Sequence, residues 1–580
     1  MRKAEVRGVK DRALAAALAR AVGEERSAPA TRLAARRFAV EAAESATALL
    51  RSEGYYDSTV APDVSTGAKP HAVIDVAPGP RTTIKQTSIA FDGPAPDAAA
   101  QAAARKALAL PDGAPARAAD VIAAEGRAVA ALSEAGYADA AAKSRAVTVD
   151  HAGHAMTAAY VLSAGALVRL DGLRIASSGR TDPRWVRRLR PWRPGAVYRP
   201  EEVAELERRL TDTQVYDTVA VALAPKTELT PDGLRPVVVS LADRRRQAFD
   251  LSAGYSTSEG ADFDVFYHLY NQLRRGDVVT LEARLAELDS RVGGEIGLPD
   301  FLSPGQTFTP SLYAFHTVTD AYDETGAIAS LDLTQRFGKT SYLTRGVSFT
   351  DSRVNDKELG SLDLKALRLI GAFYFDRTDD ALDPKRGYKA DARVVPTFLA
   401  GGEDRIYVRM LAQASAYFPL TRSAGDVIAV RGRVGSIVGA AAIDVNAPPP
   451  PGVTIKPGVP AQDRFFAGGG GSVRGYEYQG VGPFYPDGTP RGGLSLVESS
   501  IEYRHRFGTS PIGAVVFMDG GSVGDDSTPT LSRFETAVGV GARYSLGFAP
   551  IRADFAVPLQ RPKNSDQQPF QIYLSIGQSF

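Results

Sequence analysis

Cysteine is absent from the 580 residues of this chain, which excludes disulfides, thiol catalysis and metal sites built on thiolate ligands. Histidine is scarce, with six residues. Neither sign of charge dominates, because 68 lysines and arginines accompany 67 aspartates and glutamates and leave a net charge of +1. This balance gives no reason to expect a nucleic-acid partner. No apolar run approaches the roughly 18 residues that a membrane-spanning helix needs.

The opening stretch MRKAEVRGVKDRALAAALARAV is basic but lacks the uninterrupted apolar segment of a signal peptide. Low hydropathy excludes a helical membrane protein only, because the alternating strands of a β-barrel also score low. The aromatic residues divide the chain: 10 Phe, Trp and Tyr fall in residues 1–245 and 38 in residues 246–580. Aromatics are enriched in strands and at membrane interfaces. We therefore place a domain boundary near Arg245 and expect a β-rich C-terminal part.

A pattern of about 80 residues occurs three times in the N-terminal part. Its corners read EGYYD, EAGYAD and TQVYD, and the aspartates Asp57, Asp139 and Asp217 lie 82 and 78 residues apart. Each copy predicts a strand, two helices and two more strands, over residues 1–78, 79–165 and 166–245. This repeat resembles the POTRA domain, a periplasmic module that precedes certain outer-membrane barrels. Three unrelated ferredoxin-like domains are the alternative.

From residue 247 onward, apolar and polar residues alternate with the period of a β-strand. The first such strand carries Phe249, Leu251, Ala253 and Tyr255, and the last, about 570–580, carries Ile572, Leu574 and Ile576. The 335 residues from 246 to 580 allow roughly 16 units of about 21 residues, each a membrane-spanning strand with a connection. The pattern therefore predicts an all-β, 16-stranded antiparallel transmembrane barrel rather than a soluble sandwich. The terminal Phe580 resembles the C-terminal signal of bacterial outer-membrane proteins.

The most specific segment, RFFAGGGGSVRGY at 464–476, follows a proline-rich stretch that cannot form a strand. It is no phosphate-binding loop, because no Gly-Lys-Ser/Thr follows the glycines. It resembles loop six of the outer-membrane protein assembly superfamily that includes BamA and TamA. The resemblance implies that a loop over 441–493 folds into the barrel lumen with Arg474 at its tip. The residues that match the family's loop-tip contacts are Arg474, Gly475, Tyr476, Glu502, Phe517, Asp519 and Gly521.

Catalysis has little support in the sequence, and we expect neither an enzyme nor a cofactor. Residues 520–524 fit the G-x-S-x-G pattern around Ser522, but a turn rather than a helix is predicted to follow. His151 and His154 have no third metal ligand nearby, so a solvated turn is the interpretation. The basic run at 187–190 predicts an exposed face of the third module, with Trp185 and Trp192 packing the module or resting near the membrane surface.

The resemblance implies a protein that inserts or translocates other outer-membrane proteins, and three modules before 16 strands are most similar to TamA. Clients would bind POTRA strand edges and pass through a lateral gate between the first and last barrel strands. The expected gate residues are Phe249, Leu251, Ala253, Tyr255, Ile572, Leu574, Ile576, Gly577 and Phe580. The implied partners are unfolded outer-membrane or autotransporter clients, a TamB-like inner-membrane-anchored protein and outer-membrane lipid.

Two alternatives remain for this function. If N-terminal modules are missing, a BamA-type general assembly core is the better match, since BamA-like proteins usually carry five. A passive channel or structural barrel with anchoring modules is the other. The expected location is the bacterial outer membrane, with the POTRA modules in the periplasm. A protein placed there must cross the inner membrane, so we expect the signal peptide to be trimmed or missing.

Overall fold

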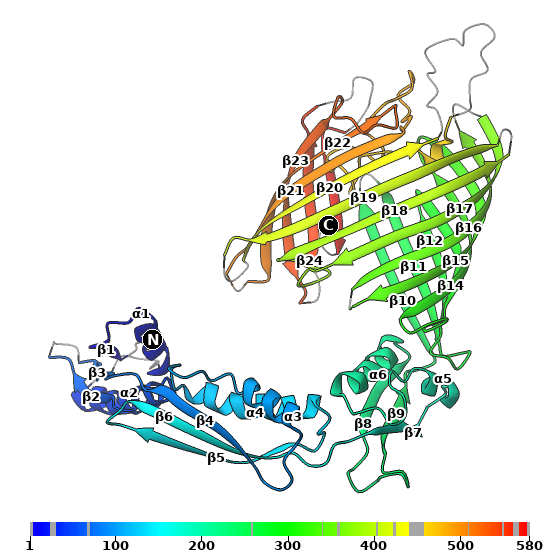
Figure 1. Cartoon of the computed structure of the whole chain (residues 1–580). Helices are drawn as coiled ribbons and strands as arrows, with labels where there is room; N and C mark the ends of the chain where they lie inside the picture. The colour runs from blue at the N-terminus through cyan, green and yellow to red at the C-terminus, as the bar shows by residue number, and fades with distance from the viewer. Residues whose placement is uncertain are drawn as a thin grey trace. The chain divides into compact units, whose positions relative to one another are not determined.

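The computed structural model (Figure 1) describes the whole chain apart from several short segments and one longer one. The residues outside the description are 1–3, 24–28, 30, 67–69, 257–258, 339, 357–359, 402–403, 422–424, 440–457, 509, 548–549, 561–567 and 577–580. Among the described residues, no helix is long and apolar enough to cross a membrane.

The N-terminal part consists of three modules, each with a three-stranded sheet and two helices. The first contains β1 (Glu5–Arg7), α1 (Arg12–Ala21), α2 (Arg32–Ser52), β2 (Thr59–Val64) and β3 (Ala72–Ala77). The second contains β4 (Thr83–Phe91), α3 (Ala98–Ala107), α4 (Ala118–Glu134), β5 (Ala141–Asp150) and β6 (Ala155–Ser163). The third contains β7 (Leu170–Ser177), α5 (Pro183–Arg188), α6 (Pro200–Asp212), β8 (Tyr216–Leu223) and β9 (Arg235–Asp243).

All three sheets have the same topology, with the module's last strand in the centre: orders β1-β3-β2, β4-β6-β5 and β7-β9-β8. The opening strand pairs parallel to the central one in every case. The predicted corners end the second helix of each module. Gly54 and Gly136 have positive φ angles there, and in the third module Gln214 takes the same left-handed conformation with φ +60°. The missing glycine is therefore replaced by a residue held in a conformation that glycine adopts more easily.

Sixteen antiparallel strands close into a barrel (Figure 1), which confirms the predicted fold class. The strands are β10 (Gln247–Ser256), β11 (Gly260–Tyr270), β12 (Val278–Ala286), β13 (Asp289–Gly297), β14 (Gln306–Val318), β15 (Tyr322–Phe337), β16 (Ser341–Asp356), β17 (Gly360–Asp376), β18 (Gly387–Ala400), β19 (Arg405–Pro419), β20 (Asp426–Val438), β21 (Ser495–Arg506), β22 (Ile512–Gly524), β23 (Glu535–Ser545), β24 (Pro550–Pro558) and β25 (Gln571–Ile576).

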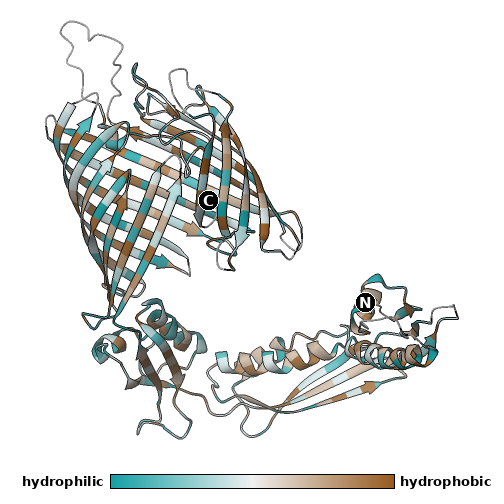
Figure 2. Ribbon diagram, turned by 180° about the vertical axis from the view of Figure 1, so that it is seen from behind, coloured by the Kyte–Doolittle hydropathy of each residue, from teal (hydrophilic) through white to brown (hydrophobic). Residues whose placement is uncertain are grey.

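Hydrophilic and hydrophobic residues alternate along the barrel strands (Figure 2), and side-chain exposure shows that the two faces of the wall differ in polarity. On β21, Ile501 and Tyr503 are 50% and 42% exposed, whereas Glu502 and Arg504 between and beside them are buried. Apolar side chains thus point outward and charged side chains point into the lumen. An apolar exterior with a polar interior is the arrangement of a membrane barrel and the reverse of a soluble one.

The chain divides into two compact units that do not follow the module boundaries. One comprises residues 1–177, 190–208 and 220–240, and the other comprises residues 178–189, 209–219 and 241–580. The barrel unit therefore includes α5. The connections after β11, β13 and the later odd-numbered strands form one rim of the barrel, here called the turn rim, and the alternate connections form the loop rim.

The structure adds detail to two secondary expectations. Trp185 and Trp192 are 5% and 3% exposed, so both pack within the protein, which is the first of the two predicted alternatives, rather than at a membrane surface. His151 and His154 lie in a turn, as predicted, but they also contact another module. Their Nδ1 atoms lie 2.5 and 3.1 Å from the two carboxylate oxygens of Asp57 in the first module. These histidines therefore join the first two modules.

Candidate functional site

The connection between β20 and β21 returns into the barrel, and its described part, residues 458–494, is here called the lumenal loop. A single 3₁₀ turn at Ala461–Asp463 is its regular element. Most of its residues are buried, and Val473 and Tyr476 have no exposed surface. The loop packs with inward-facing residues of several strands in one apolar cluster that includes Leu364 and Val523. It therefore fills part of the lumen.

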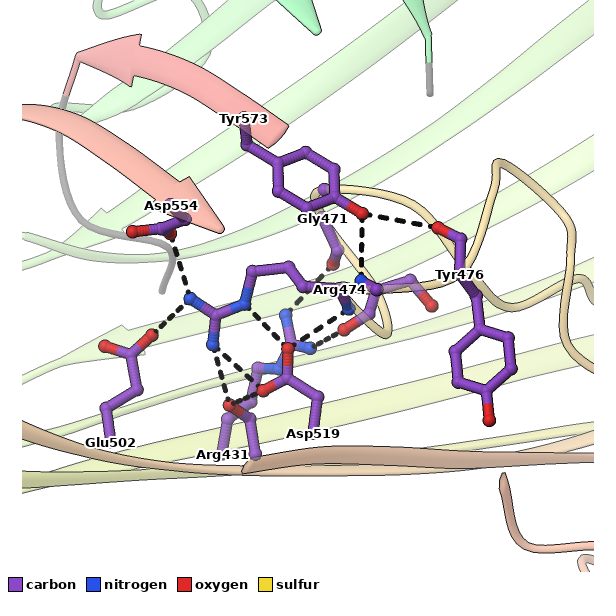
Figure 3. A network of polar contacts seen from close by, with 12 residues as sticks. Arg431, Gly471, Arg474, Tyr476, Glu502, Asp519, Asp554 and Tyr573 are labelled. Atoms are coloured by element: carbon purple, nitrogen blue, oxygen red, sulfur yellow. Dashed lines mark hydrogen bonds and ion pairs between the residues drawn. The ribbon is translucent and has the colours of Figure 1, made fainter. Parts of the chain in front are cut away.

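Arg474 is the centre of the loop-tip network (Figure 3). Its Nε and Nη2 donate to Oδ2 and Oδ1 of Asp519 at 2.6 and 2.9 Å, a bidentate pair across β22. Its Nη1 lies 2.7 Å from Oε1 of Glu502 on β21. The guanidinium carbon stands 3.5 Å from the ring centroid of Phe517. Arg474 is 2% exposed, and an unpaired guanidinium would be strongly unfavourable there.

Close approach requires both glycines among the seven loop-tip residues. Gly475 has φ +99°, and a Cβ on it would lie 2.9 Å from that of Ala537. A Cβ on Gly521 would lie 2.8 Å from a methyl carbon of Val473. Tyr476 is held by its hydroxyl, which donates toward the backbone oxygen of Gln560 at 2.9 Å. The structure thus brings together all seven loop-tip residues predicted from the sequence.

The sequence interpretation missed the third acidic partner of Arg474. Nη1 also lies 3.2 Å from Oδ2 of Asp554 on β24, and Arg543 and Arg552 pair with the same carboxylate. Arg504 balances Glu502 at 2.8 Å. The signal was available, because Asp554 stands on the polar face of an alternating strand. Alternation places a charged side chain in the lumen but does not predict which of these side chains contacts the loop.

A second contact group holds the incoming limb of the lumenal loop against other strands. Asp463 accepts a hydrogen bond from the Tyr407 hydroxyl, and Arg368 Nη2 donates to both of its carboxylate oxygens, at 3.1 and 3.2 Å. Arg464 lies 3.3 Å from Asp356, whose carboxylate also accepts the Ala461 N–H at 2.7 Å. The loop is therefore fixed to β16, β17 and β19 as well as to β21, β22 and β24.

The first and last strands of the barrel, β10 and β25, meet at a junction that is here called the seam, and few backbone pairs join them. Ten residue pairs join β10 to β11, whereas two, Tyr255 with Leu574 and Ser256 with Tyr573, join β10 to β25 among the described residues. The ladder does not continue to Gly254 and Ser575, although both are described.

The lumenal loop contacts both sides of this seam. Tyr573 of β25 accepts the Gly475 N–H at 3.1 Å, and its hydroxyl lies 3.3 Å from the Tyr476 carbonyl oxygen. On the other side, Glu259, in the connection after β10, accepts the Gly470 N–H at 3.1 Å. The loop therefore connects the two strand ends that share few hydrogen bonds with each other.

The predicted gate residues face outward where they are described. Phe249, Leu251, Tyr255, Ile572 and Leu574 are between 45% and 67% exposed, and Ala253 is exposed as well. Ile576 ends β25 opposite Ile551 of β24. Gly577 and Phe580 lie outside the described residues.

This combination of a closed 16-stranded barrel, N-terminal α/β modules and an arginine-tipped loop in the lumen defines a class of outer-membrane β-barrel proteins with POTRA-like modules. Residues 271–580 match the Omp85 superfamily domain. The chain belongs to the Omp85 superfamily, which confirms the resemblance on which the BamA/TamA comparison was based.

The chain is also similar to individual proteins. The chain is 23% identical over 471 residues to the outer membrane protein assembly factor BamA of Neisseria meningitidis, covering 71% of this chain and 56% of that protein. It thus spans about half the length of this curated relative. The crystal structure of Haemophilus ducreyi BamA lacking POTRA domains 1–3 superposes with a TM-score of 0.67 at 17% identity, covering 84% of this chain and 99% of the other. CdiB from Acinetobacter baumannii is also similar, at 15% identity, with a TM-score of 0.48 and coverage of 85% and 89%.

Proposed function

We propose that this protein inserts other β-barrel proteins into the outer membrane through a lateral gate between β10 and β25, with the three modules in the periplasm. The observation that carries the proposal is the seam, where two backbone pairs join β10 to β25 among the described residues, against ten between β10 and β11 and six between β24 and β25. Opening it would expose two strand edges, and a client strand can pair with either edge through main-chain hydrogen bonds. A passive channel needs no such seam.

The lumenal loop is the element that controls this opening. It contacts Glu259 on one side of the seam and Tyr573 on the other, while Arg474 fixes it to the wall. Release of Arg474 would remove contacts from both strand ends together. The energy for insertion comes from the client, which buries strand edges and apolar surface as it folds.

Clients reach the gate from the module edges. β5 is an edge strand of ten residues, and nine of the ten are exposed. Extended client segments would add to this edge by β-augmentation, which tolerates many sequences because main-chain groups carry the contact. A photo-crosslinking residue in place of Val147, which is 42% exposed, should capture unfolded client and not folded client.

The experiment for the gate is a reversible crosslink. The chain has no cysteine, so Tyr255→Cys with Leu574→Cys, which face each other across the seam, gives a single disulfide. Oxidation should stop client insertion into proteoliposomes and a reductant should restore it. The matched control is Val434→Cys with Val497→Cys, a paired position between β20 and β21. Full insertion with the seam crosslinked would exclude a gate at this place.

Within this function, we propose a TamA-like role in autotransporter assembly with a TamB-like, inner-membrane-anchored partner. The three modules that this sequence contains are the number that the resemblance to TamA implies. A BamA-type general role is the competing assignment. Quantitative outer-membrane proteomics after depletion separates them: loss confined to autotransporters supports the TamA-like role, and loss of most barrels supports the BamA-type role. Unchanged client levels would favour the passive barrel.

A further inference from the structure

Helix α5 and two turns of the turn rim form one continuous, rigid structure within the barrel unit. The N–H of Asp182, which caps α5, donates to the carbonyl of Arg274 at 2.8 Å, and Arg274 Nε donates to the Arg180 carbonyl at 2.9 Å. Asn271 donates to the buried Thr181 hydroxyl at 2.8 Å. These contacts fix the helix to the β11–β12 turn.

The turn itself has a defined conformation. The buried carboxylate of Asp277 accepts the backbone N–H groups of Leu273 and Arg275. In the next turn of this rim, between β13 and β14, Asp300 accepts the Gly305 N–H at 2.7 Å, and its carbonyl receives Arg188 Nη2 at 3.4 Å. Side chains on α5 and on both turns therefore project from fixed backbone.

The exposed side chains of this structure are cationic and apolar. The cationic ones are Arg184, Arg187, Arg188, Arg274 and Arg275. The apolar ones are Leu273, Phe301 and Leu302, which are 55%, 43% and 72% exposed. The carboxylates of the two turns, Asp277 and Asp300, accept backbone N–H groups of their own turns and are buried, and Asp182 accepts the Arg184 N–H as the N-cap of α5. None of these five arginines forms a salt bridge with a carboxylate in the described part of the chain. We name these eight residues the rim patch.

The position of the rim patch follows from the barrel. The outward faces of β12 and β14 carry Leu281 and Leu312, which are 47% and 62% exposed and belong to the lipid-facing surface. The strands end at the turns of the rim patch, so the patch lies where the hydrocarbon core gives way to head groups. Apolar side chains that enter this boundary and guanidinium groups beside them form the pattern of an interfacial anchor.

We propose that the rim patch binds the anionic phospholipid head groups of the inner, periplasmic leaflet beside the gate. This inference rests on the proposed function only for the orientation of the barrel. Guanidinium pairs with phosphate through two parallel hydrogen bonds, which favours Arg over Lys in such a surface. Each basic residue near an anionic membrane surface contributes about five-fold in affinity.

The test uses the two tryptophans. Trp192→Phe leaves Trp185 of α5 as the single tryptophan in the full chain. This protein is placed in phosphatidylcholine nanodiscs that contain either dansyl-labelled phosphatidylglycerol or dansyl-labelled phosphatidylcholine as tracer. Energy transfer from Trp185 should be several-fold greater to the phosphatidylglycerol tracer, and high salt should reduce the difference. Equal transfer to both tracers would overturn the proposal.

Variants test whether the arginines of the rim patch, rather than positive charge elsewhere on the protein, cause the preference for phosphatidylglycerol. R184Q/R187Q/R188Q should abolish the preference for phosphatidylglycerol, and so should R274Q/R275Q, which leaves the sequence of α5 and the backbone bond from Asp182 to Arg274 unchanged. The control R51Q/R105Q/K106Q removes three exposed cations from helices of the first two modules and should keep the preference. Heat-modified electrophoretic mobility shows whether each barrel is folded.

The outcome is independent of client insertion. A preference that survives both variant sets refutes the rim patch. If the preference depends on the arginines but the protein inserts no client, the lipid site stands and the proposed function falls.

Discussion

Replacing Arg474 by Gln should release the lumenal loop without unfolding the barrel. The substitution leaves Glu502, Asp519 and Asp554 without their shared cation in a site where Arg474 is 2% exposed. Breaking a buried ion pair by removing one partner costs about 3–5 kcal/mol. The lower end applies here, because Arg504 and further arginines remain beside the carboxylates. About 3 kcal/mol corresponds to a change on the order of a hundred-fold in the opening equilibrium.

The assay reads loop opening directly. Val473 is fully buried beside Arg474, and the chain has no other thiol once Val473→Cys is introduced. If opening and closing are fast relative to labelling, the maleimide reaction rate follows the population of the open loop. R474Q should therefore raise the labelling rate on the order of a hundred-fold, while heat-modified mobility of the barrel is unchanged.

A control in the same loop tests whether charge alone matters. Arg491 is 14% exposed and pairs with Asp525, which is 40% exposed, so Arg491→Gln removes an equal charge from a pair whose carboxylate remains open to solvent. Such pairs contribute about 0–1 kcal/mol, and labelling should rise no more than about five-fold. A labelling rate for R474Q within the range of R491Q would refute the assignment of Arg474 as the principal anchor.

Three further outcomes are expected. Gly475→Ala should release the loop nearly as much as loss of Arg474, because the φ of Gly475 is positive and the added methyl group would contact β23. Gly471→Ala should be labelled at the same rate as the parent, because a methyl group added there has no neighbour within 4 Å. Asp554→Asn should raise the labelling rate less than Asp519→Asn, since it removes one contact of Arg474 rather than a bidentate pair. The pKa of Asp57 is lowered, chiefly by the hydrogen bond with His151. The stabilisation that Asp57 gives to the contact between the first two modules is therefore present above the usual carboxyl pKa of 3.8 and is lost as the pH falls below that value. Spin labels on α2 and α3 should then report broader distances in acid, and an unchanged distribution would contradict the role of this contact.

The fold was predictable because its patterns are local and repeat. Alternation along a strand fixes which face of β21 carries Glu502, and a 16-fold repetition of strand and connection fixes the architecture. The module corners were recognisable as short motifs. Gln214 shows that the left-handed backbone conformation of the corner is kept even where the glycine of the other two modules is replaced. The resemblance to a known loop then supplied the partners of Arg474, which no periodicity could have paired.

The sequence could not show which lumen-facing side chains of distant strands contact one another. Asp554 lies 80 residues from Arg474, and nothing local to β24 distinguishes it from other inward carboxylates. The same limit applies to Asp463, Arg464 and their partners on β16, β17 and β19, which no motif predicted. Because these two contact groups hold different parts of one loop, releasing Arg474 leaves the incoming limb fixed. The loop tip can then move away from Tyr573 without leaving the barrel, so the seam can open and close again on the same loop.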